Sequence, residues 1–382
     1  MILPGATIGV LGGGQLGRML ALEARRMGYR VEALDPDPTG PAGQVCDHVI
    51  AGSFRDVEAA RSLALRCDVI TLETEHIALP VLEAVAALRP LHPAPSVLAT
   101  VQDRLAQRRF LDQVGVPHTP YAEVSTLAQL GEALDRLGRP AILKTRREGY
   151  DGKGQARIRV GDDPAQAWSR VGGAPSILEA FVPFEREISV LLARAADGSV
   201  AVYPVAENDH RNHILHTTVA PARVSGPAAA KARDISIAIA EGLGIVGMMA
   251  VELFALEDGQ LLVNEVAPRT HNSGHFTYGG AATSQFEQHA RAILGLPLGD
   301  THLFGPCVMV NLLGDLWSRR DDVWRAVASN PMAHLHLYGK ANATPGRKMG
   351  HVLLLDPDTD AALSWAEQFC AFGAEPSVDP GR

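Results

Sequence analysis

Residues 251–266 read VELFALEDGQLLVNEV, a pattern typical of two antiparallel strands joined by a tight turn. Asp258-Gly259 lies between apolar runs and favours a two-residue type I′ turn, which needs positive φ at both positions. Counting outward from that turn places Glu252 opposite Glu265. Directly opposed residues have Cβ atoms roughly 4.5–5.5 Å apart, where two like charges are destabilising. The segment therefore predicts a pair of acids that needs a neutralising partner.

A divalent cation bridging Glu252 and Glu265 would remove this repulsion. Mg²⁺ held by one or two carboxylates and completed by phosphate oxygens is the arrangement expected where ATP is used. We therefore predict Mg²⁺, or Mn²⁺ in its place, at these two residues. The alternative is a pair of solvent-facing acids on an outer face of the sheet, which would contribute little.

A second informative segment, residues 144–155, reads KTRREGYDGKGQ and joins an expected strand at 141–145 to an alternating run. Gly152-Lys153 is followed by Gly154 and a strand, whereas a Walker A loop needs Ser or Thr and then a helix. A mobile flap carrying Lys153, with Lys144 on the strand beneath it, would cover nucleotide phosphates and close over a reactive intermediate. A solvated hairpin is the plainer alternative.

The N-terminal third alternates expected strands, at 8–11, 31–34 and 69–72, with expected helices at 15–28 and 56–67. Such alternation implies parallel βαβ units. The first helix opens on GGGQLG at 12–17, which satisfies G-x-G-x-x-G, and Asp35 ends the second strand. This is the dinucleotide fingerprint in its expected context. It leaves open NAD or FAD, another anionic ligand, and a tight turn without any ligand.

The rest of the chain suggests two further segments. A Pro-rich stretch at 89–95 breaks the alternating pattern, and the residues after it are richer in strands with antiparallel character. We predict domains at 1–95, 96–300 and 301–382. Between Asp322 and Asp356 no acid occurs, and basic residues gather there, namely Arg325, Lys340, Arg347, Lys348 and His351. Such a positive island suits a phosphate, although a solvated basic face is the alternative.

Composition restricts the class of protein. The 382 residues carry 35 Lys and Arg against 43 Asp and Glu, a net charge of −8, with 46% hydrophobic and 20% charged residues. These are globular values, and the acidic balance argues against nucleic acid or an anionic membrane as partner. Four scattered cysteines predict neither a zinc site nor a disulfide framework. No apolar run approaches the roughly 18 residues of a membrane span, so we expect a cytoplasmic protein.

Taken together, these motifs resemble the ATP-grasp superfamily and, within it, the 5-(carboxyamino)imidazole ribonucleotide synthases of purine biosynthesis. The resemblance extends from Gly12 to about Val352 and is carried by GGGQLG at 12–17, TLETEH at 71–76, GYDGKGQ at 149–155, NEVAPRTHNSGH at 264–275 and the segment 340–351 that ends in RKMGH. It implies a mixed α/β and α+β protein with the ATP-grasp fold: a Rossmann-like preATP-grasp domain, a central grasp domain and a small C-terminal domain.

The resemblance also implies site residues. ATP would be contacted by Arg104, Lys144, Gly149, Tyr150, Asp151, Gly152, Lys153, Gly154, Gln155, Glu179, Ala180, Phe181, Val182, Glu187, His210, Asn264 and Glu265, with 179–182 beside adenine and Glu187 on the ribose. The amine substrate would lie against Gly14, Gln15, Leu16, Glu75, Asn272, Ser273, Lys340, Arg347 and Lys348. One departure is Arg104, because many grasp enzymes have Lys there, and the geometry of a point charge is lost.

The implied reaction is the ATP-dependent carboxylation of 5-aminoimidazole ribonucleotide by bicarbonate. It would pass through carboxyphosphate and give 5-(carboxyamino)imidazole ribonucleotide, ADP and phosphate in purine (IMP) biosynthesis. The catalytic candidates are Lys153, Asp151, Arg269 and His275, and either Asp151 or His275 would take the proton that the amine loses. Expected partners are the small molecules ATP, bicarbonate and the aminoimidazole ribonucleotide. We expect no NAD, no biotin and a homodimer.

Three alternatives stay open at this point. An NAD-dependent oxidoreductase would use residues 12–17 and Asp35, but it leaves the glutamate pair and the second glycine loop unexplained. A related grasp ligase, such as a formate-dependent glycinamide ribonucleotide transformylase or a carboxylase acting on biotin, would share the ATP site. A non-catalytic nucleotide-binding module would not need two opposed acids.

Overall fold

The structure is a computed structural model that describes residues 1–147, 149 and 154–371 of the chain. Its N-terminal lobe is a parallel four-stranded sheet in the order β3-β2-β1-β4, with bounds β1 (Thr7–Leu11), β2 (Arg30–Asp35), β3 (His48–Ala51) and β4 (Val69–Leu72). All five residues of β1 are buried, as expected of a central parallel strand. The sheet is accompanied by α1 (Gln15–Arg26), α2 (Val57–Arg66) and α3 (Leu79–Ala86). The βαβ prediction is confirmed, and β3 is a strand that the sequence did not indicate.

A second lobe is an antiparallel sheet in the order β5-β8-β6-β7. Its strands are β5 (Tyr121–Val124), β6 (Ala141–Thr145), β7 (Gln155–Ile158) and β8 (Ser176–Ala180). Helices α6 (Leu127–Leu137) and α7 (Pro164–Arg170) bury their apolar faces on it, and α4 (Pro95–Val101) and α5 (Arg104–Val114) lead into it. The glycine-rich segment 146–154 joins β6 to β7, so the predicted strand-loop-strand arrangement is confirmed for its two strands.

The largest sheet is antiparallel and runs in the order β14-β13-β9-β11-β12-β15-β17-β16, with β10 paired to β9. Its strands are β9 (Arg186–Arg194), β10 (Val200–Val202), β11 (Ala206–Arg211), β12 (Ile214–Ala220), β13 (Gly247–Ala255), β14 (Leu261–Ala267), β15 (Cys307–Leu313), β16 (Ala333–Leu337) and β17 (Lys348–Leu355). The remaining helices are α8 (Gly226–Leu243), α9 (Thr277–Gly280), α10 (Gln285–Leu294), α11 (Arg320–Ser329) and α12 (Thr359–Ala371). No helix among the described residues is long and apolar enough to cross a membrane.

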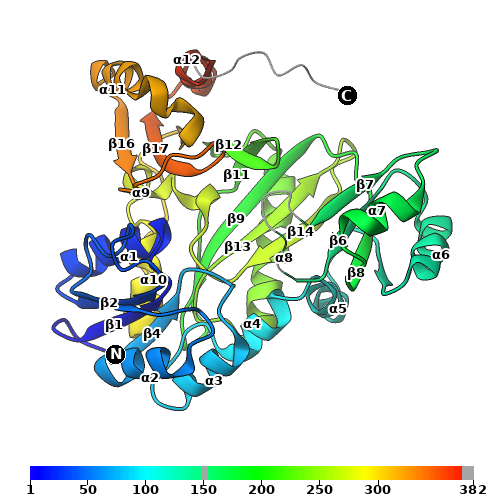
Figure 1. Ribbon diagram of the computed structural model, residues 1–382. Coiled ribbons are helices and arrows are strands. Elements are labelled where there is room, and N and C mark those ends of the chain that lie inside the picture. The colour runs from blue at the N-terminus through cyan, green and yellow to red at the C-terminus, as the bar shows by residue number, and fades with distance from the viewer. Residues whose placement is uncertain (148, 150–153, 372–382) are drawn as a thin grey trace.

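The large sheet joins the parts of the molecule (Figure 1). The N-terminal lobe lies on one side of it, the β5–β8 lobe on the other, and α11 and α12 lie at the C-terminal end. Helix α10 packs on α1, with Phe286, Ala290 and Ile293 in one apolar cluster with Met19 and Leu20. The predicted division after residue 300 does not interrupt the sheet, because β12 pairs directly with β15. The predicted division after residue 95 falls at the first residue of α4.

The β13–β14 hairpin differs from its predicted form in the length of its loop and in a bulge in one strand. Its loop has three residues, because Leu256 pairs with Gln260 and only Gly259 takes positive φ, at +79°. The predicted two-residue type I′ turn is therefore wrong. Asp258 instead accepts a hydrogen bond from the N–H of Gln260. The register then shifts by one residue at a bulge beyond Leu253, which leaves Asn264 unpaired in the ladder.

These two irregularities cancel. Leu253 faces Val263, and beyond the bulge Glu252 faces Glu265. The predicted opposition of the two glutamates is therefore confirmed, although the turn that predicted it is not the turn that forms. The bulge also turns Asn264 out of the ladder beside Glu265, at the edge of a large cleft.

Candidate active site

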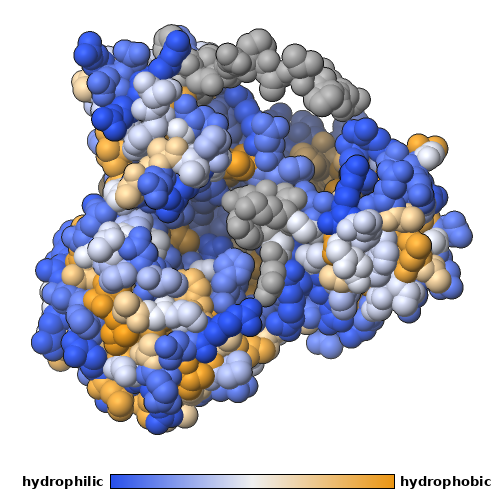
Figure 2. All heavy atoms as spheres, viewed as in Figure 1, coloured by the Kyte–Doolittle hydropathy of each residue, from blue (hydrophilic) through white to orange (hydrophobic). Residues whose placement is uncertain are grey.

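A cleft of about 1720 Å³ lies between the lobes and collects most of the predicted site residues. The surface is hollowed in the middle of the view, beside the C-terminal part of the molecule (Figure 2). Predicted residues on its wall are Gln15, Leu16, Glu75, Arg104, Lys144, Gly149, Gln155, Glu179, Phe181, Glu187, His210, Glu252, Asn264, Glu265, Arg269, Asn272 and Lys348. Tyr150, Asp151, Gly152 and Lys153 lie outside the described residues.

Acidic side chains gather on the floor of the cleft. Glu252 and Glu265 come from neighbouring strands, and Glu187 of β9 lies one strand further, paired with Phe254. Burial raises the pKa of Glu252 to about 7, and the charges of Glu265 and Glu187 add to this effect while His210 opposes it. The two opposed carboxylates supply hard oxygen donors, which fit Mg²⁺ or Mn²⁺. The described residues hold no cluster of three metal ligands, so phosphate oxygens or water would complete the coordination.

Two cations meet one buried acid beside this floor. Glu179 accepts from Arg108 at 2.6 Å and lies 2.7 Å from the Lys144 Nζ, and its side chain is 4% exposed. Burial alone would raise the pKa of Glu179, but the charges of Arg108 and Lys144 outweigh it and bring that pKa down to about 2. Arg108 also donates to the main-chain oxygens of Val263 and Asn264. It thereby ties α5 to the glutamate hairpin.

Arg108 is a site residue that the sequence reasoning missed. It lies one helical turn after Arg104 on α5, and residues four apart share a helix face, so the spacing was an available signal. Arg104 donates to the main-chain oxygens of Thr145 at 2.9 Å and Gly149 at 2.8 Å. It therefore braces the base of the glycine-rich segment, a role that its fork suits better than a Lys point charge would.

Aromatic side chains also line the cleft, among them Phe181, Phe184 and Phe254. Phe181 lines the cleft, and the Arg157 guanidinium lies over its ring, 4.4 Å from the centroid. Of its predicted neighbours, Val182 is buried and Ala180 is the last residue of β8. Phe184 and Phe254 stack with centroids 4.6 Å apart and both line the cleft. Neither was predicted, and no charge or glycine pattern marks them. Such flat apolar surfaces suit a nucleotide base.

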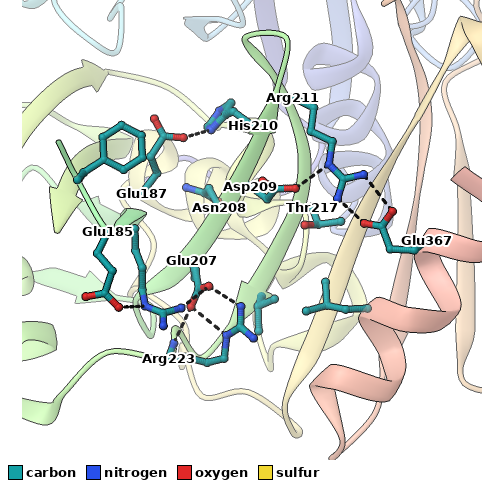
Figure 3. Close-up of a pocket in the computed structure, with 14 residues that line it drawn as sticks. Glu185, Glu187, Glu207, Asn208, Asp209, His210, Arg211, Thr217, Arg223 and Glu367 are labelled. Atoms are coloured by element: carbon teal, nitrogen blue, oxygen red, sulfur yellow. Dashed lines mark hydrogen bonds and ion pairs between the residues drawn. The ribbon is translucent and has the colours of Figure 1, made fainter. Parts of the chain in front are cut away.

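His210 lies with Glu187 at the border of a smaller pocket of about 360 Å³. Its Nδ1 is 2.5 Å from Glu187, which raises the pKa of His210 against the opposing effect of burial. Figure 3 shows His210 turned toward Glu187 and Arg211 turned toward Glu367 of α12. The arginines of this pocket, Arg186, Arg211 and Arg223, already pair with carboxylates. We therefore assign it no ligand.

Near the N-terminal lobe, the predicted substrate residues make contacts within the protein itself. Arg269 donates to Glu75 at 2.8 Å, and both line the cleft. Gly14, predicted to contact substrate, gives its N–H to Glu73, a cleft residue that was not predicted. Ser273 is fully buried against His271 rather than open to the cleft.

The predicted residues that the structure describes and that do not line the cleft are Gly14, Gly154, Ala180, Val182, Ser273, His275, Lys340 and Arg347. His275 is fully buried, hydrogen-bonded to Gln285 and packed on Phe286, and burial holds its pKa well below the usual range. Lys340 donates to the Lys348 main-chain oxygen, and burial lowers its pKa to about 8. Arg347 donates to the main-chain oxygen of Asn342. Lys340 and Arg347 thus hydrogen-bond within the segment 340–348. Of the basic residues between Asp322 and Asp356, Lys348 lines the cleft.

Comparison with known proteins first defines the class. Family models match as the ribonucleotide synthetase preATP-grasp domain at 5–102, the ATP-grasp domain at 109–286 and the phosphoribosylaminoimidazole carboxylase C-terminal domain at 307–364. The protein is therefore an ATP-grasp protein, and the fold class predicted from the sequence is confirmed.

Individual relatives narrow the class. The N5-carboxyaminoimidazole ribonucleotide synthase of Brucella melitensis is 44% identical over 93% of this chain and 98% of its own length. A solved N5-carboxyaminoimidazole ribonucleotide synthetase with ADP superposes with a TM-score of 0.94 at 42% identity, covering 97% of this chain and 98% of that chain. The Aspergillus clavatus enzyme, solved with ADP and 5-aminoimidazole ribonucleotide, gives 0.89 at 34% identity, covering 96% and 98%. The chain belongs to the N5-carboxyaminoimidazole ribonucleotide synthase family, which confirms the resemblance read from its motifs.

Proposed function

We propose that this protein is an ATP-dependent ligase that forms a carbon–nitrogen bond in purine biosynthesis. It carboxylates the amine of 5-aminoimidazole ribonucleotide with bicarbonate and yields N5-carboxyaminoimidazole ribonucleotide, ADP and phosphate. One observation carries the proposal: a single cleft is lined by both the opposed Glu252 and Glu265 and the Glu75–Arg269 pair. Family membership over nearly the whole chain supports it.

The chemistry follows from the charges on the cleft wall. Bicarbonate is a poor electrophile, so phosphorylation by ATP activates it as carboxyphosphate. Lys144 and Lys348 neutralise negative charge that develops on the transferring phosphoryl oxygens. Glu252 and Glu265 would hold Mg²⁺ or Mn²⁺, which supplies further neutralisation when bound. Carboxyphosphate hydrolyses readily, so the proposed reaction requires that water be kept from it in the cleft between the lobes.

The amine must lose a proton during this reaction. Of the two candidates, His275 is buried away from the cleft, and Asp151 belongs to the glycine-rich segment outside the described residues. With His275 in the core, we propose Asp151 as the acceptor, Lys153 as a phosphate contact and Arg269 as a catalytic residue near the amine substrate. The proposal also keeps a homodimer in the cytoplasm as a prediction from the sequence.

Of the alternatives, an NAD-dependent oxidoreductase fits poorly. The N–H groups of Gly13 and Gly14, which a dinucleotide pyrophosphate would need, are taken by Asp35 and Glu73. A formate-dependent grasp ligase would share the ATP end of the cleft, and the similarity to N5-carboxyaminoimidazole ribonucleotide synthases supports the carboxylase instead.

The proposed reaction is tested with the purified protein, ATP, Mg²⁺ and bicarbonate. We expect ADP release to require 5-aminoimidazole ribonucleotide, measured by a coupled ADP assay and by detection of the carboxylated product. Glycinamide ribonucleotide with formate is the control substrate pair. ADP release that ignores the aminoimidazole, or that needs formate instead, contradicts the proposal.

The proposed metal ligands are tested by Glu265→Gln. We expect kcat to fall about 100-fold or more, because one carboxylate of the pair is lost while the fold stays intact. Glu257→Gln, in the loop of the same hairpin, is the matched control and should stay near wild type. Thermal melting of both variants checks folding. Near-normal turnover of Glu265→Gln would remove the metal assignment.

A further inference from the structure

The amide of Gln285, the first residue of α10, is paired with the main chain of His271. Its Oε1 accepts the His271 N–H at 2.9 Å, and its Nε2 donates to the His271 carbonyl oxygen at 2.8 Å. The Gln285 side chain is fully buried, and a Cβ on Gly274 would lie 2.5 Å from its Oε1. Because a main-chain N–H only donates and a carbonyl only accepts, the orientation of this amide is fixed.

The same amide reaches the other end of the segment 271–275. Gln285 Nε2 lies 3.2 Å from Nδ1 of His275, and an amide nitrogen donates and does not accept. The neutral His275 ring therefore carries its proton on Nε2. One buried side chain thus bonds the first and the last residue of a segment whose members His271 and Asn272 line the cleft.

The His271 ring points from this segment toward the glutamate pair. Its Nδ1 accepts from the N–H of Ser273 at 3.3 Å, so the proton of the neutral ring is on Nε2. That Nε2 lies 3.7 Å from Oε1 of Glu252, and both residues line the cleft. The place of this donor depends on the main chain of His271, which Gln285 holds through both its N–H and its carbonyl oxygen.

We propose that Gln285 is a positioning residue of the reaction. It does not line the cleft, and it acts by holding the His271 imidazole beside Glu252. That the held imidazole serves catalysis rests on the proposed function. That Gln285 holds the segment rests on its hydrogen bonds alone.

Gln288, about one turn further along α10, offers a matched control. It is also fully buried, and its amide pairs in the same way with the N–H and the carbonyl oxygen of Gly299, at 2.7 Å and 2.8 Å. Neither Gln288 nor Gly299 lines the cleft. Gln288→Glu therefore makes the same chemical change on the same helix, away from the segment 271–275.

The hold on the segment is tested by thermal melting of Gln285→Glu. A carboxylate there faces the His271 carbonyl oxygen and the bare Nδ1 of His275, so the folded state favours the protonated acid and raises its pKa. Stability is then lost as the pH rises above the unfolded pKa of about 4.3. We expect the Tm of Gln285→Glu, and of Gln288→Glu, to fall further below wild type between pH 5.5 and pH 8.5. A Gln285→Glu protein that melts with wild type throughout overturns the hold.

The positioning role is tested by steady-state kinetics of the same two variants, at a temperature where melting shows both to be folded. We expect kcat of Gln285→Glu to fall about ten-fold or more, because a small displacement of a group at the reacting centre is costly. Gln288→Glu should keep the kcat of wild type. An unchanged kcat in Gln285→Glu, or an equal loss in both variants, overturns the role.

A double-mutant cycle with His271→Ala shows whether Gln285 acts through His271. We expect Gln285→Glu to cause no further loss of kcat once His271 is removed, because the group that it positions is gone. Losses that add overturn the role, and so does a His271→Ala variant with wild-type kcat. If the wild-type protein releases ADP without regard to the aminoimidazole, the proposed function fails, while the melting experiment still decides whether Gln285 holds the segment.

Discussion

At the scale of single residues, Glu179 shows how one buried acid organises the nucleotide end of the cleft. Arg108 of α5 and Lys144 of β6 both reach it, so that three elements meet at one carboxylate. Removing one member of such a buried group is costly, because an unpaired charge is left behind. The Lys predicted to contact phosphate is thus held in place before any nucleotide arrives.

We predict that Glu179→Gln lowers the free energy of unfolding by about 3 kcal/mol at pH 7. The folded-state pKa of Glu179 is depressed from 4.5 to about 2, so its stabilisation is present above pH 4.5 and is lost as the pH falls toward 2. The gap between wild type and variant should therefore shrink below pH 4.5, measured by urea unfolding from pH 7 to pH 3.5. Glu58→Gln is the exposed control. A gap that stays constant over this range would contradict the assigned pairing.

At the scale of elements, the β11–β12 hairpin links the cleft to the C-terminal helix. Its turn residues Asn212 and His213 both line the cleft and both have positive φ, at 50° and 65°. Non-glycine residues pay for this conformation, and such strain is usual at functional sites. On the other side, Arg211 pairs with Glu367 of α12 (Figure 3). His210 therefore lies on a hairpin that has a strained turn at the cleft and is anchored to α12 through Arg211.

We predict that His213→Gly raises the free energy of unfolding by about 0.5 kcal/mol. Glycine removes the left-handed cost but loses more conformational entropy on folding, so the net gain is small. Activity should not improve, because glycine loses the contact between His213 Nδ1 and Gln155 Nε2, which lie 3.4 Å apart and join the hairpin to the glycine-rich segment. His334→Gly on the exposed face of β16 is the matched control and should destabilise. Thermal and urea unfolding check both; a destabilised His213→Gly variant would contradict the strain assignment.

At the scale of the whole molecule, the large sheet makes the C-terminal part inseparable from the grasp part. Strand β12 pairs with β15 from Thr217 to Ala220, and Val219 shares an apolar cluster with Val308, Val310 and Val352. A break at the predicted boundary would expose one unpaired strand edge and one apolar face. Both are aggregation hazards.

We therefore predict that a chain ending at residue 306 will be insoluble, or will melt well below the full-length protein. The uncovered edge of β12 and the lost cover on Val219 are the physical reasons. Soluble yield, size-exclusion chromatography and thermal melting against the full-length protein measure this. A soluble, monodisperse fragment with the full-length Tm would show that the two parts are independent.

Much of the fold and site was predictable because local patterns are set by short-range physics. Alternating apolar runs predicted the βαβ lobe, and the spacing of Glu252 and Glu265 about Asp258-Gly259 predicted their opposition. Family resemblance supplied the nucleotide-binding set, most of whose described members line one cleft. The predicted opposition of the two glutamates is correct even though the predicted turn type is wrong. The bulge at Asn264 compensates for the extra residue in the loop.

The rest depended on long-range packing, which no local pattern encodes. The sequence by itself predicted the opposed glutamates and the glycine-rich loops, since residue type and spacing decide those features, and its resemblance to the ATP-grasp family predicted the fold. Only the tertiary structure decided that Arg108 joins Glu179, that His275 lies in the core, and that Glu73, far from the glycine loop along the chain, occupies it. A backbone N–H takes the nearest suitable acceptor, and which acceptor is nearest is known only once the chain is folded.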